Sequence, residues 1–176
     1  MGATAGSLLW EQTARASLAR GLTLRELVQA SSHAAVVTPL ESSCRWAEFG
    51  GRRLIVTDTR VRVEDVLALK APAASELLIR VLGGAIGKLG QRIEGQAELV
   101  LGQPSTVFLT PTSELVAFVT GAAQGHYPLE PDARGVVRLA PSPRLPELAQ
   151  REGSAVVTLG GASLDRAREL VRAVLP

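Results

Sequence analysis

The chain is poor in the residues that build most catalytic and metal centres. Its 176 residues include one cysteine and two histidines. A single cysteine excludes an internal disulfide, and these three residues cannot alone supply the four side chains of a typical zinc site. Aromatic residues make up only 3% of the chain, so few side chains are available for stacking on nucleic-acid bases.

Long apolar runs and a strong net charge are missing as well. No window approaches the roughly 18 uncharged apolar residues of a transmembrane helix, so we expect no membrane span. The opening sequence MGATAGSLLW has no basic region before its apolar residues, so the chain as it stands carries no signal peptide. A net charge of +2 over this length gives no field suited to a polyanion. The length fits one domain with a core of its own.

Helical signals come first along the chain. Residues 7–20 are expected to form a helix. The sequence LTLREL, which begins at Leu22, places Thr23 at the N-cap and a glutamate three positions later, as in a capping box flanked by a hydrophobic staple. It predicts a short helix over residues 24–31.

The spacing of apolar residues then changes to two, which indicates strands. We expect a strand over residues 34–46, with Pro39 at a bulge or an edge. Residues 54–67 are the most regular strand, with one face buried and the other in solvent. The expected buried face carries Thr57, Thr59, Val61 and Val63, and the expected solvent face carries Asp58, Arg60, Arg62 and Glu64.

Glycine, proline and serine divide the rest of the chain. Residues 83–95 contain five glycines and are predicted to form a bent or bulged strand and loop. Residues 164–175 repeat leucine and valine at helical spacing behind Ser163, a good N-cap, which predicts an amphipathic closing helix. Further strands are expected at 76–82, 105–110, 114–121, 124–129, 136–139 and 154–159.

The order helix, antiparallel strands, helix favours a mainly β fold. Connections of hairpin length suit a small closed or partly closed antiparallel barrel, OB-like in type, better than a βαβ sheet. We divide the chain into an N-terminal helical segment (1–32), the barrel (33–140), and a connector with the closing amphipathic helix (141–176).

Several of these segments together resemble a poorly characterised family of exported bacterial proteins. They are LTLRELV, AAVVTPLESSCRW, TDTRVRVEDVLAL, GGAIGKLGQRIEG, STVFLTP and GAAQGHY, and the resemblance covers residues 22–139. More distantly, the succession is similar to the netrin-module and tissue-inhibitor-of-metalloproteinase group, whose core is an OB-type barrel. The resemblance implies an extracytoplasmic protein, periplasmic or secreted.

The chain differs from the sequence patterns of these families at two positions that bear on function. Thr38-Pro39 stands where the exported family has Gly-Thr. The metalloproteinase inhibitors place an N-terminal cysteine on the catalytic zinc, whereas the single cysteine here, Cys44, falls in a predicted strand. Inhibition by that chemistry is therefore not expected of this chain.

Catalytic interpretations of individual residues find little support. The run from Gly83 to Lys88 superficially suggests a phosphate loop, but residue 82 is leucine where the first glycine of the motif belongs, and the Ser or Thr after the lysine is missing. His33 and His126 have no metal-ligand partner at helical spacing. Cys44 lacks the sequence context of a cysteine protease. We expect no catalytic residue, metal or cofactor.

These observations favour a non-catalytic, exported protein-interaction or structural module. The alternative is a netrin-module-like regulator or inhibitor of an enzyme that uses an edge loop instead of a cysteine. We expect the partner to be another protein and not a nucleic acid, because the alternating charges of residues 58–64 suit a solvated sheet face. The candidate interaction loop contains Gly83, Gly84, Gly87, Lys88 and Arg92.

Overall fold

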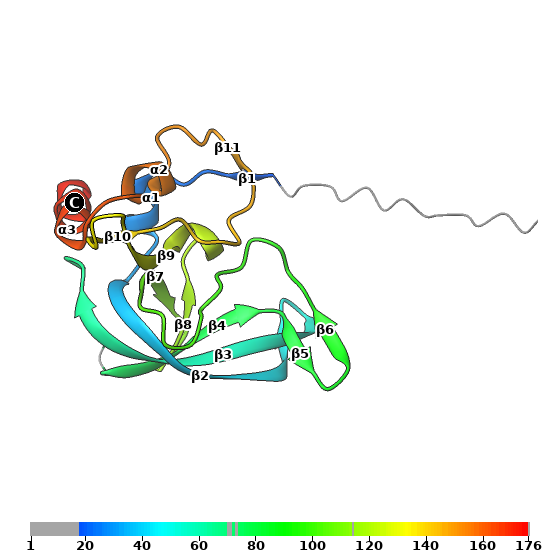
Figure 1. Cartoon of the computed structure of the whole chain (residues 1–176). Coiled ribbons are helices and arrows are strands. Elements are labelled where there is room, and N and C mark those ends of the chain that lie inside the picture. Colours follow the sequence, from blue (N-terminus) through cyan, green and yellow to red (C-terminus); the bar gives the residue numbers. More distant parts are fainter. Residues whose placement is uncertain (1–17, 70–71, 73, 114, 176) are drawn as a thin grey trace, which may run out of the picture.

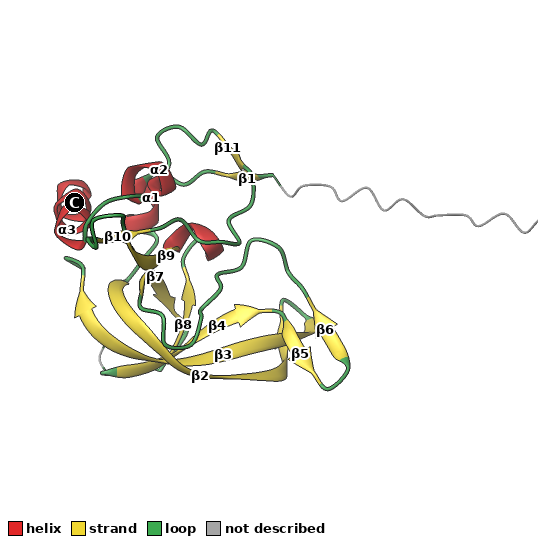
Figure 2. Cartoon of the chain, viewed as in Figure 1, coloured by secondary structure: helices red, strands yellow, loops and turns green. Residues whose placement is uncertain are grey.

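A computed structural model describes residues 18–69, 72, 74–113 and 115–175 of the chain (Figure 1). The helix expected at 7–20 lies outside these residues except for its last positions. There the prediction is wrong, because Ala19–Arg20 form a short strand, β1, that pairs in parallel with β11 (Leu148–Ala149). The long strands lie on one side of the molecule and the helices gather on the other (Figure 2).

A seven-stranded sheet with the order β10-β9-β7-β2-β3-β4-β8 dominates the fold, which is mainly β as expected. The last strand of this order, β8, also pairs with β7, so β7, β2, β3, β4 and β8 make a partly closed ring. The strands are β2 (His33–Phe49), β3 (Arg52–Val66), β4 (Glu76–Leu82), β7 (Ser105–Pro111), β8 (Val116–Val119), β9 (His126–Pro131) and β10 (Val137–Leu139).

Most of the strands expected from period-two patterns are confirmed, with shifted ends. The pairing of β2 with β3 changes register between Pro39 and Glu41, so the predicted bulge at Pro39 is confirmed. The strand expected at 124–129 begins later, because the 3-10 helix η1 (Ala122–Gly125) precedes it.

One pairing in the ring departs from the antiparallel arrangement that we expected. β4 and β8 are parallel, with Leu78 opposite Val116 and Arg80 opposite Phe118. Hairpins force antiparallel pairing only on strands joined by short turns. β5, β6 and β7 all lie between β4 and β8 in the sequence, and this long connection allows the parallel orientation.

Two of the helices begin where the sequence predicts N-caps. α1 (Leu24–Gln29) has the predicted capping box, in which the Thr23 hydroxyl accepts from the Glu26 N–H and the Glu26 carboxylate accepts from the Thr23 N–H. Ser163 caps α3 (Leu164–Val174) as predicted. No helix in the described part of the chain is long and apolar enough to cross a bilayer.

The strand expected at 154–159 is wrong, because α2 (Ala155–Leu159) forms there. The β-branched residues of the sequence AVVTL favoured a strand. The hydroxyl of Ser154 accepts from the Val157 N–H and starts a helix instead. Ala155, Val156 and Leu159 are then buried on one helical face.

Two apolar clusters form the core. One lies inside the ring and includes Val37, Val61, Ile79 and Val107. The other joins the sheet to all three helices; its buried members are Leu24, Leu27, Val28, Ala34, Val36, Leu67, Phe108, Tyr127, Leu139, Ala155, Leu159, Ala167 and Val171. The apolar face of the closing helix is therefore docked on the sheet.

The burial of β3 is confirmed at its centre and corrected at Asp58. Val61 and Thr59 are buried, as expected for the inner face of the ring. Asp58 was expected to face solvent, but it is only 6% exposed. Arg80 from β4 and Arg45 from β2 lie over its carboxylate, so the outer face of the sheet is not uniformly solvated.

Candidate functional site

The glycine-rich segment forms a small hairpin at one end of the sheet. Its strands are β5 (Gly84–Ile86) and β6 (Leu89–Gln91), which among the described strands pair only with each other. Both β2 and β3 contact β5, so the hairpin is held against the ends of the two longest strands (Figure 1). The bent strand and loop predicted for residues 83–95 is therefore a hairpin followed by irregular chain.

Two glycines allow this close approach. Gly84 has φ +139°, and a Cβ atom there would lie 2.5 Å from the Thr57 hydroxyl and 2.7 Å from the Cys44 sulfur. Gly83 has φ +99°, and its carbonyl oxygen accepts a hydrogen bond from the Thr57 hydroxyl at 2.7 Å. A side chain at Gly84 would push the hairpin away from the sheet, and the Cβ of one at Gly83 would lie 2.7 Å from the Gln91 carbonyl oxygen of β6.

The hairpin forms one wall of a cleft of about 470 Å³. Inner-face residues of β2, β3 and β4 and the segment at 96–99 form the rest. The residues that line it are Ser42, Thr57, Thr59, Val81, Leu82, Gly83, Gly84, Gly90, Gln91, Arg92, Ile93, Gln96, Ala97, Glu98, Leu99 and Arg144.

The five candidate interaction residues divide between the cleft and the hairpin turn. Gly83, Gly84 and Arg92 line the cleft. Gly87 and Lys88 lie at the turn between β5 and β6, exposed and outside the cleft lining. The structure therefore joins part of the predicted loop to a concave surface that the sequence did not indicate.

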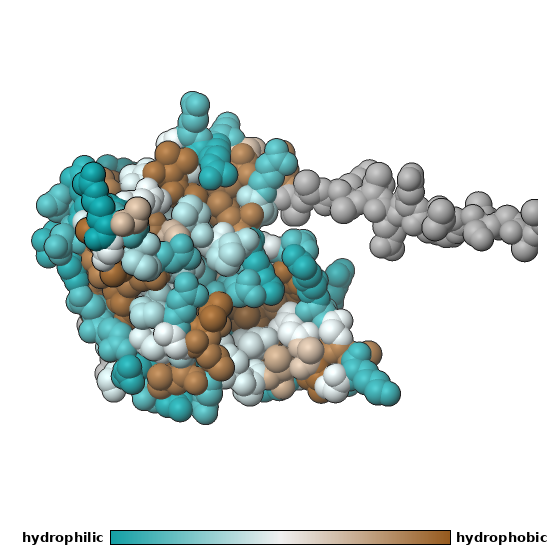
Figure 3. All heavy atoms as spheres, viewed as in Figure 1, coloured by the Kyte–Doolittle hydropathy of each residue, from teal (hydrophilic) through white to brown (hydrophobic). Residues whose placement is uncertain are grey.

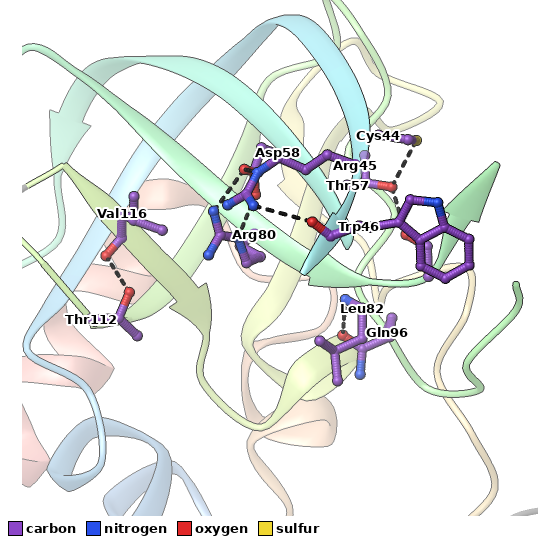
Figure 4. Close-up of polar contacts among 11 residues, drawn as sticks. Cys44, Arg45, Trp46, Thr57, Asp58, Arg80, Leu82, Gln96, Thr112 and Val116 are labelled. Atoms are coloured by element: carbon purple, nitrogen blue, oxygen red, sulfur yellow. Dashed lines mark hydrogen bonds and ion pairs between the residues drawn. The ribbon is translucent and has the colours of Figure 1, made fainter. Parts of the chain in front are cut away.

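Two glutamines give the cleft its hydrogen-bonding character. The Oε1 atom of Gln91 accepts from the Ile55 N–H at 2.7 Å, and that of Gln96 accepts from the Leu82 N–H at 3.1 Å (Figure 4 shows the second bond). Among the described residues neither Nε2 group has a partner, so each glutamine keeps donors to offer. The hydroxyls of Ser42 and Thr59 bond to each other at 2.8 Å nearby.

Charges at the cleft rim are already neutralised. Arg144 makes two hydrogen bonds to the Glu98 carboxylate, at 2.9 and 2.7 Å. Arg92 pairs with Glu94 at 2.9 Å. Of the described lining residues, none is a histidine, cysteine or aspartate. The cleft can therefore form neutral hydrogen bonds and apolar contacts, and the one carboxylate among its described lining residues, Glu98, is held in the ion pair with Arg144.

A second polar group lies on the opposite, outer face of the sheet. Arg80 binds Asp58 through two hydrogen bonds, at 2.6 and 2.7 Å, and Arg45 adds a third at 3.0 Å (Figure 4). Burial alone would raise the pKa of the Asp58 carboxyl, but these hydrogen bonds outweigh burial and hold the pKa below its ordinary value. The two arginines and one carboxylate carry a net charge of +1.

Other charges on the outer face form cross-strand pairs. Arg60 lies between Glu41 on β2 and Glu76 on β4, at 2.8 and 2.7 Å. Arg62 pairs with Glu64 on its own strand. Carboxylates on the same face therefore neutralise Arg60 and Arg62.

The histidines and the cysteine do not meet in an open site. His126 is fully buried between the hydroxyls of Ser142 and Ser105, at 2.9 and 3.2 Å, and burial lowers its pKa to about 4. Cys44 is half-buried, with its sulfur 3.3 Å from the Thr57 hydroxyl. His33 is the first residue of β2. Within the described chain, no three His, Cys, Asp or Glu side chains converge as a metal site would need.

The sequence alone did not indicate the two glutamines of the cleft. Gln91 and Gln96 lie in or beside the glycine-rich segment, but nothing in their spacing connects them to the inner face of β3. Comparison of the chain with known protein families, curated proteins and solved structures finds no match. The cleft must therefore be interpreted from its own chemistry.

Proposed function

We propose that this chain is a non-catalytic protein-interaction module that binds an extended polypeptide segment in the cleft beside the β5–β6 hairpin. The observation that carries the proposal is the neutral, hydrogen-bonding character of the cleft lining. Its free donors are the side-chain amides of Gln91 and Gln96. At the rim, Arg144 and Glu98 neutralise each other. Polypeptide backbone offers the carbonyl acceptors that such donors need.

The apolar part of the lining suits the same class of ligand. Val81, Ile93 and Leu99 provide surface for one or two apolar side chains between the polar groups. On the face seen in Figure 3, apolar side chains form small patches separated by polar ones. A module of this kind would recognise a short segment and not a broad apolar surface.

The proposal includes an OB-type barrel as the scaffold. Its support is the ring of five strands in which β2, β3 and β4 follow one another and β7 and β8 complete the circuit. OB-type barrels are five-stranded and partly open. An extracytoplasmic location is part of the proposal as well, and it rests on the resemblance of residues 22–139 to exported bacterial proteins.

A second candidate is a regulator or inhibitor of an enzyme, acting without an N-terminal cysteine. The observation that favours it is the projecting turn of the β5–β6 hairpin, where Lys88 and Leu89 are exposed. An exposed, well-anchored loop is what an inhibitor inserts into an active site. In this case Lys88→Ala or Leu89→Ala would abolish binding, and filling the cleft would have no effect.

Filling the cleft tests the first candidate directly. Ser42 is exposed and lines the cleft, so Ser42→Trp places a large side chain there, at the cost of the hydrogen bond to Thr59. Circular dichroism checks that the variant is folded. Ser113, in the turn between β7 and β8, is exposed and outside the cleft lining, so Ser113→Trp is the matched control. A random-peptide display library selected on the native protein provides the probe.

The expected result is a set of peptides that bind the native chain and Ser113→Trp but bind Ser42→Trp at least tenfold more weakly. Selected peptides that bind all three proteins equally would contradict peptide binding in the cleft.

Fractionation of the cells that encode the protein, with an antibody against it, tests the extracytoplasmic location. Recovery only from the cytoplasm would contradict export.

A further inference from the structure

One edge of β2 is open over half of the strand. β7 pairs with β2 only over residues 33–37, and the Gly102 N–H bonds to the Pro39 carbonyl just beyond. From Glu41 to Phe49, β3 is the only described strand that pairs with β2. Figure 1 shows this part of β2 at the lower margin of the sheet. An edge of this length can template pairing with another strand.

Two rows of ion-paired side chains, each running across β4, β3 and β2, end at this edge, and the two rows carry opposite net charge. The first runs from Glu76 on β4 through Arg60 on β3 to Glu41 on β2 and has a net charge of −1. The second runs from Arg80 on β4 through Asp58 on β3 to Arg45 on β2 and has a net charge of +1. Their end groups stay accessible, since the side chains of Glu41 and Arg45 are 67% and 50% exposed.

We propose that the open edge of β2 pairs antiparallel with the same edge of a second copy of this chain, with the two-fold axis at Ser43. In this register Glu41 of each copy lies opposite Arg45 of the other. The negatively charged row of each copy then meets the positively charged row of the other copy, so the dimer contains two such contacts. The contact is isologous, so it closes at two subunits and does not propagate.

Neighbouring registers are less favourable. An axis at Arg45 would oppose two arginines, and like charges directly across a strand pair are destabilising. An axis at Cys44 would place Arg45 opposite Ser43 and leave Glu41 without a counter-charge. Charged side chains usually protect an edge by repelling a second strand. The spacing of four between Glu41 and Arg45 makes this edge attractive to its own copy in one register.

The side chains on the other face fit the same register. Ser42 lies opposite Cys44 of the second copy, a pair of small side chains. Trp46, which is 39% exposed, lies opposite Leu40 of the second copy. The turn that carries Leu101, 55% exposed, lies next to Leu40 and adds apolar surface there. The Gly102–Pro39 hydrogen bond occupies the edge at that point, so the paired stretch runs from about Leu40 to Trp46 in each copy.

Disulfide trapping tests the register. In a Cys44→Ser background, Ser43→Cys brings two introduced thiols face to face across the axis. Directly opposed residues of antiparallel strands have Cα atoms about 4.5–5.5 Å apart, within the range of a disulfide. Glu48→Cys in the same background is the control, because its two copies lie roughly 33 Å apart in this register. We expect a covalent dimer from the first variant and none from the second under mild oxidation.

Sedimentation equilibrium tests the charge pairing without any new cysteine. Glu41→Gln removes both inter-subunit pairs and should weaken the dimer roughly tenfold. Glu48→Gln, farther along the same edge, should leave the dissociation constant within about twofold. Circular dichroism checks that each variant is folded.

A native chain that stays monomeric up to its solubility limit would overturn the proposal. So would cross-linking through native Cys44 with none from the Ser43→Cys variant. Glu41 and Ser43, the residues changed in these tests, do not line the cleft, whereas Ser42 does. A dimer that binds no peptide, or a monomer that binds one, therefore separates this inference from the proposed function.

Discussion

Replacing Gly84 with alanine should loosen the hairpin that forms one wall of the cleft. Two costs combine at this position. Gly84 has φ +139°, which an alanine adopts at a cost of about 1–3 kcal/mol. The new Cβ would also lie 2.5 Å from the Thr57 hydroxyl and 2.7 Å from the Cys44 sulfur, and overpacking of this kind costs about 1–3 kcal/mol. We expect Gly84→Ala to lower the free energy of unfolding by about 3 kcal/mol.

The matched control lies on the other strand of the same hairpin. Gly90 lies outside the left-handed region of φ, and a Cβ atom there would meet nothing within 4 Å. Gly90→Ala should therefore change stability by no more than about 0.5 kcal/mol, or raise it slightly by restricting the unfolded chain. Urea denaturation followed by far-ultraviolet circular dichroism gives both free energies.

A second readout comes from thermal melting. For a chain of this size, about 3 kcal/mol corresponds to roughly 6–12 °C in Tm. Equal melting temperatures for Gly84→Ala and Gly90→Ala would mean that the hairpin is not held against β2 and β3. Cys44→Ala should relieve part of the cost in the double variant, because it removes one of the two contacts.

Three further predictions concern stability. Since burial lowers the pKa of His126 to about 4, the unfolded chain takes up a proton at a higher pH than the folded chain does. Acidification from about pH 6.5 to 4 should therefore lower the free energy of unfolding by up to about 3 kcal/mol. Urea titrations across that range should show no such loss in His126→Gln. Asp58→Asn should cost about 2–3 kcal/mol in chemical denaturation because it leaves Arg80 partly buried without its counter-charge, whereas Glu94→Gln, at an exposed pair, should stay within about 0.5 kcal/mol. Ser163→Ala should lower stability by about 1 kcal/mol through loss of the α3 cap, and Ser163→Thr should retain most of it in the same assay.

Local patterns predicted the elements that depend on local interactions. The capping box at Thr23 and the cap at Ser163 are satisfied by residues three positions away, so the sequence contains the whole interaction. The strand at 76–82 has the predicted bounds because its alternation is regular. The helix at 155–159 was missed because the β-branched residues of this segment favoured a strand, and its cap at Ser154 was not recognised.

The remaining features depend on contacts between distant segments. Asp58 alternates as a solvent-facing residue should, and only the positions of Arg45 and Arg80 on neighbouring strands explain its burial. The parallel pairing of β4 and β8 joins residues separated by three other strands. The cleft also depends on contacts between distant segments, because Gln91 and Gln96 accept hydrogen bonds from backbone N–H groups of β3 and β4. The glycines of the predicted loop indicated unusual backbone but not the concave surface beside it.

We propose that the cleft binds an extended polypeptide through the side-chain amides of Gln91 and Gln96. Nuclear magnetic resonance can observe these groups directly, because each side-chain amide gives its own pair of proton signals. Titration with a display-selected peptide should shift the side-chain amide signals of Gln91 and Gln96, together with the backbone signals of Gly83 and Gly84. Shifts confined to Arg45, Asp58 and Arg80 on the outer face, with the glutamine amides unmoved, would contradict the account.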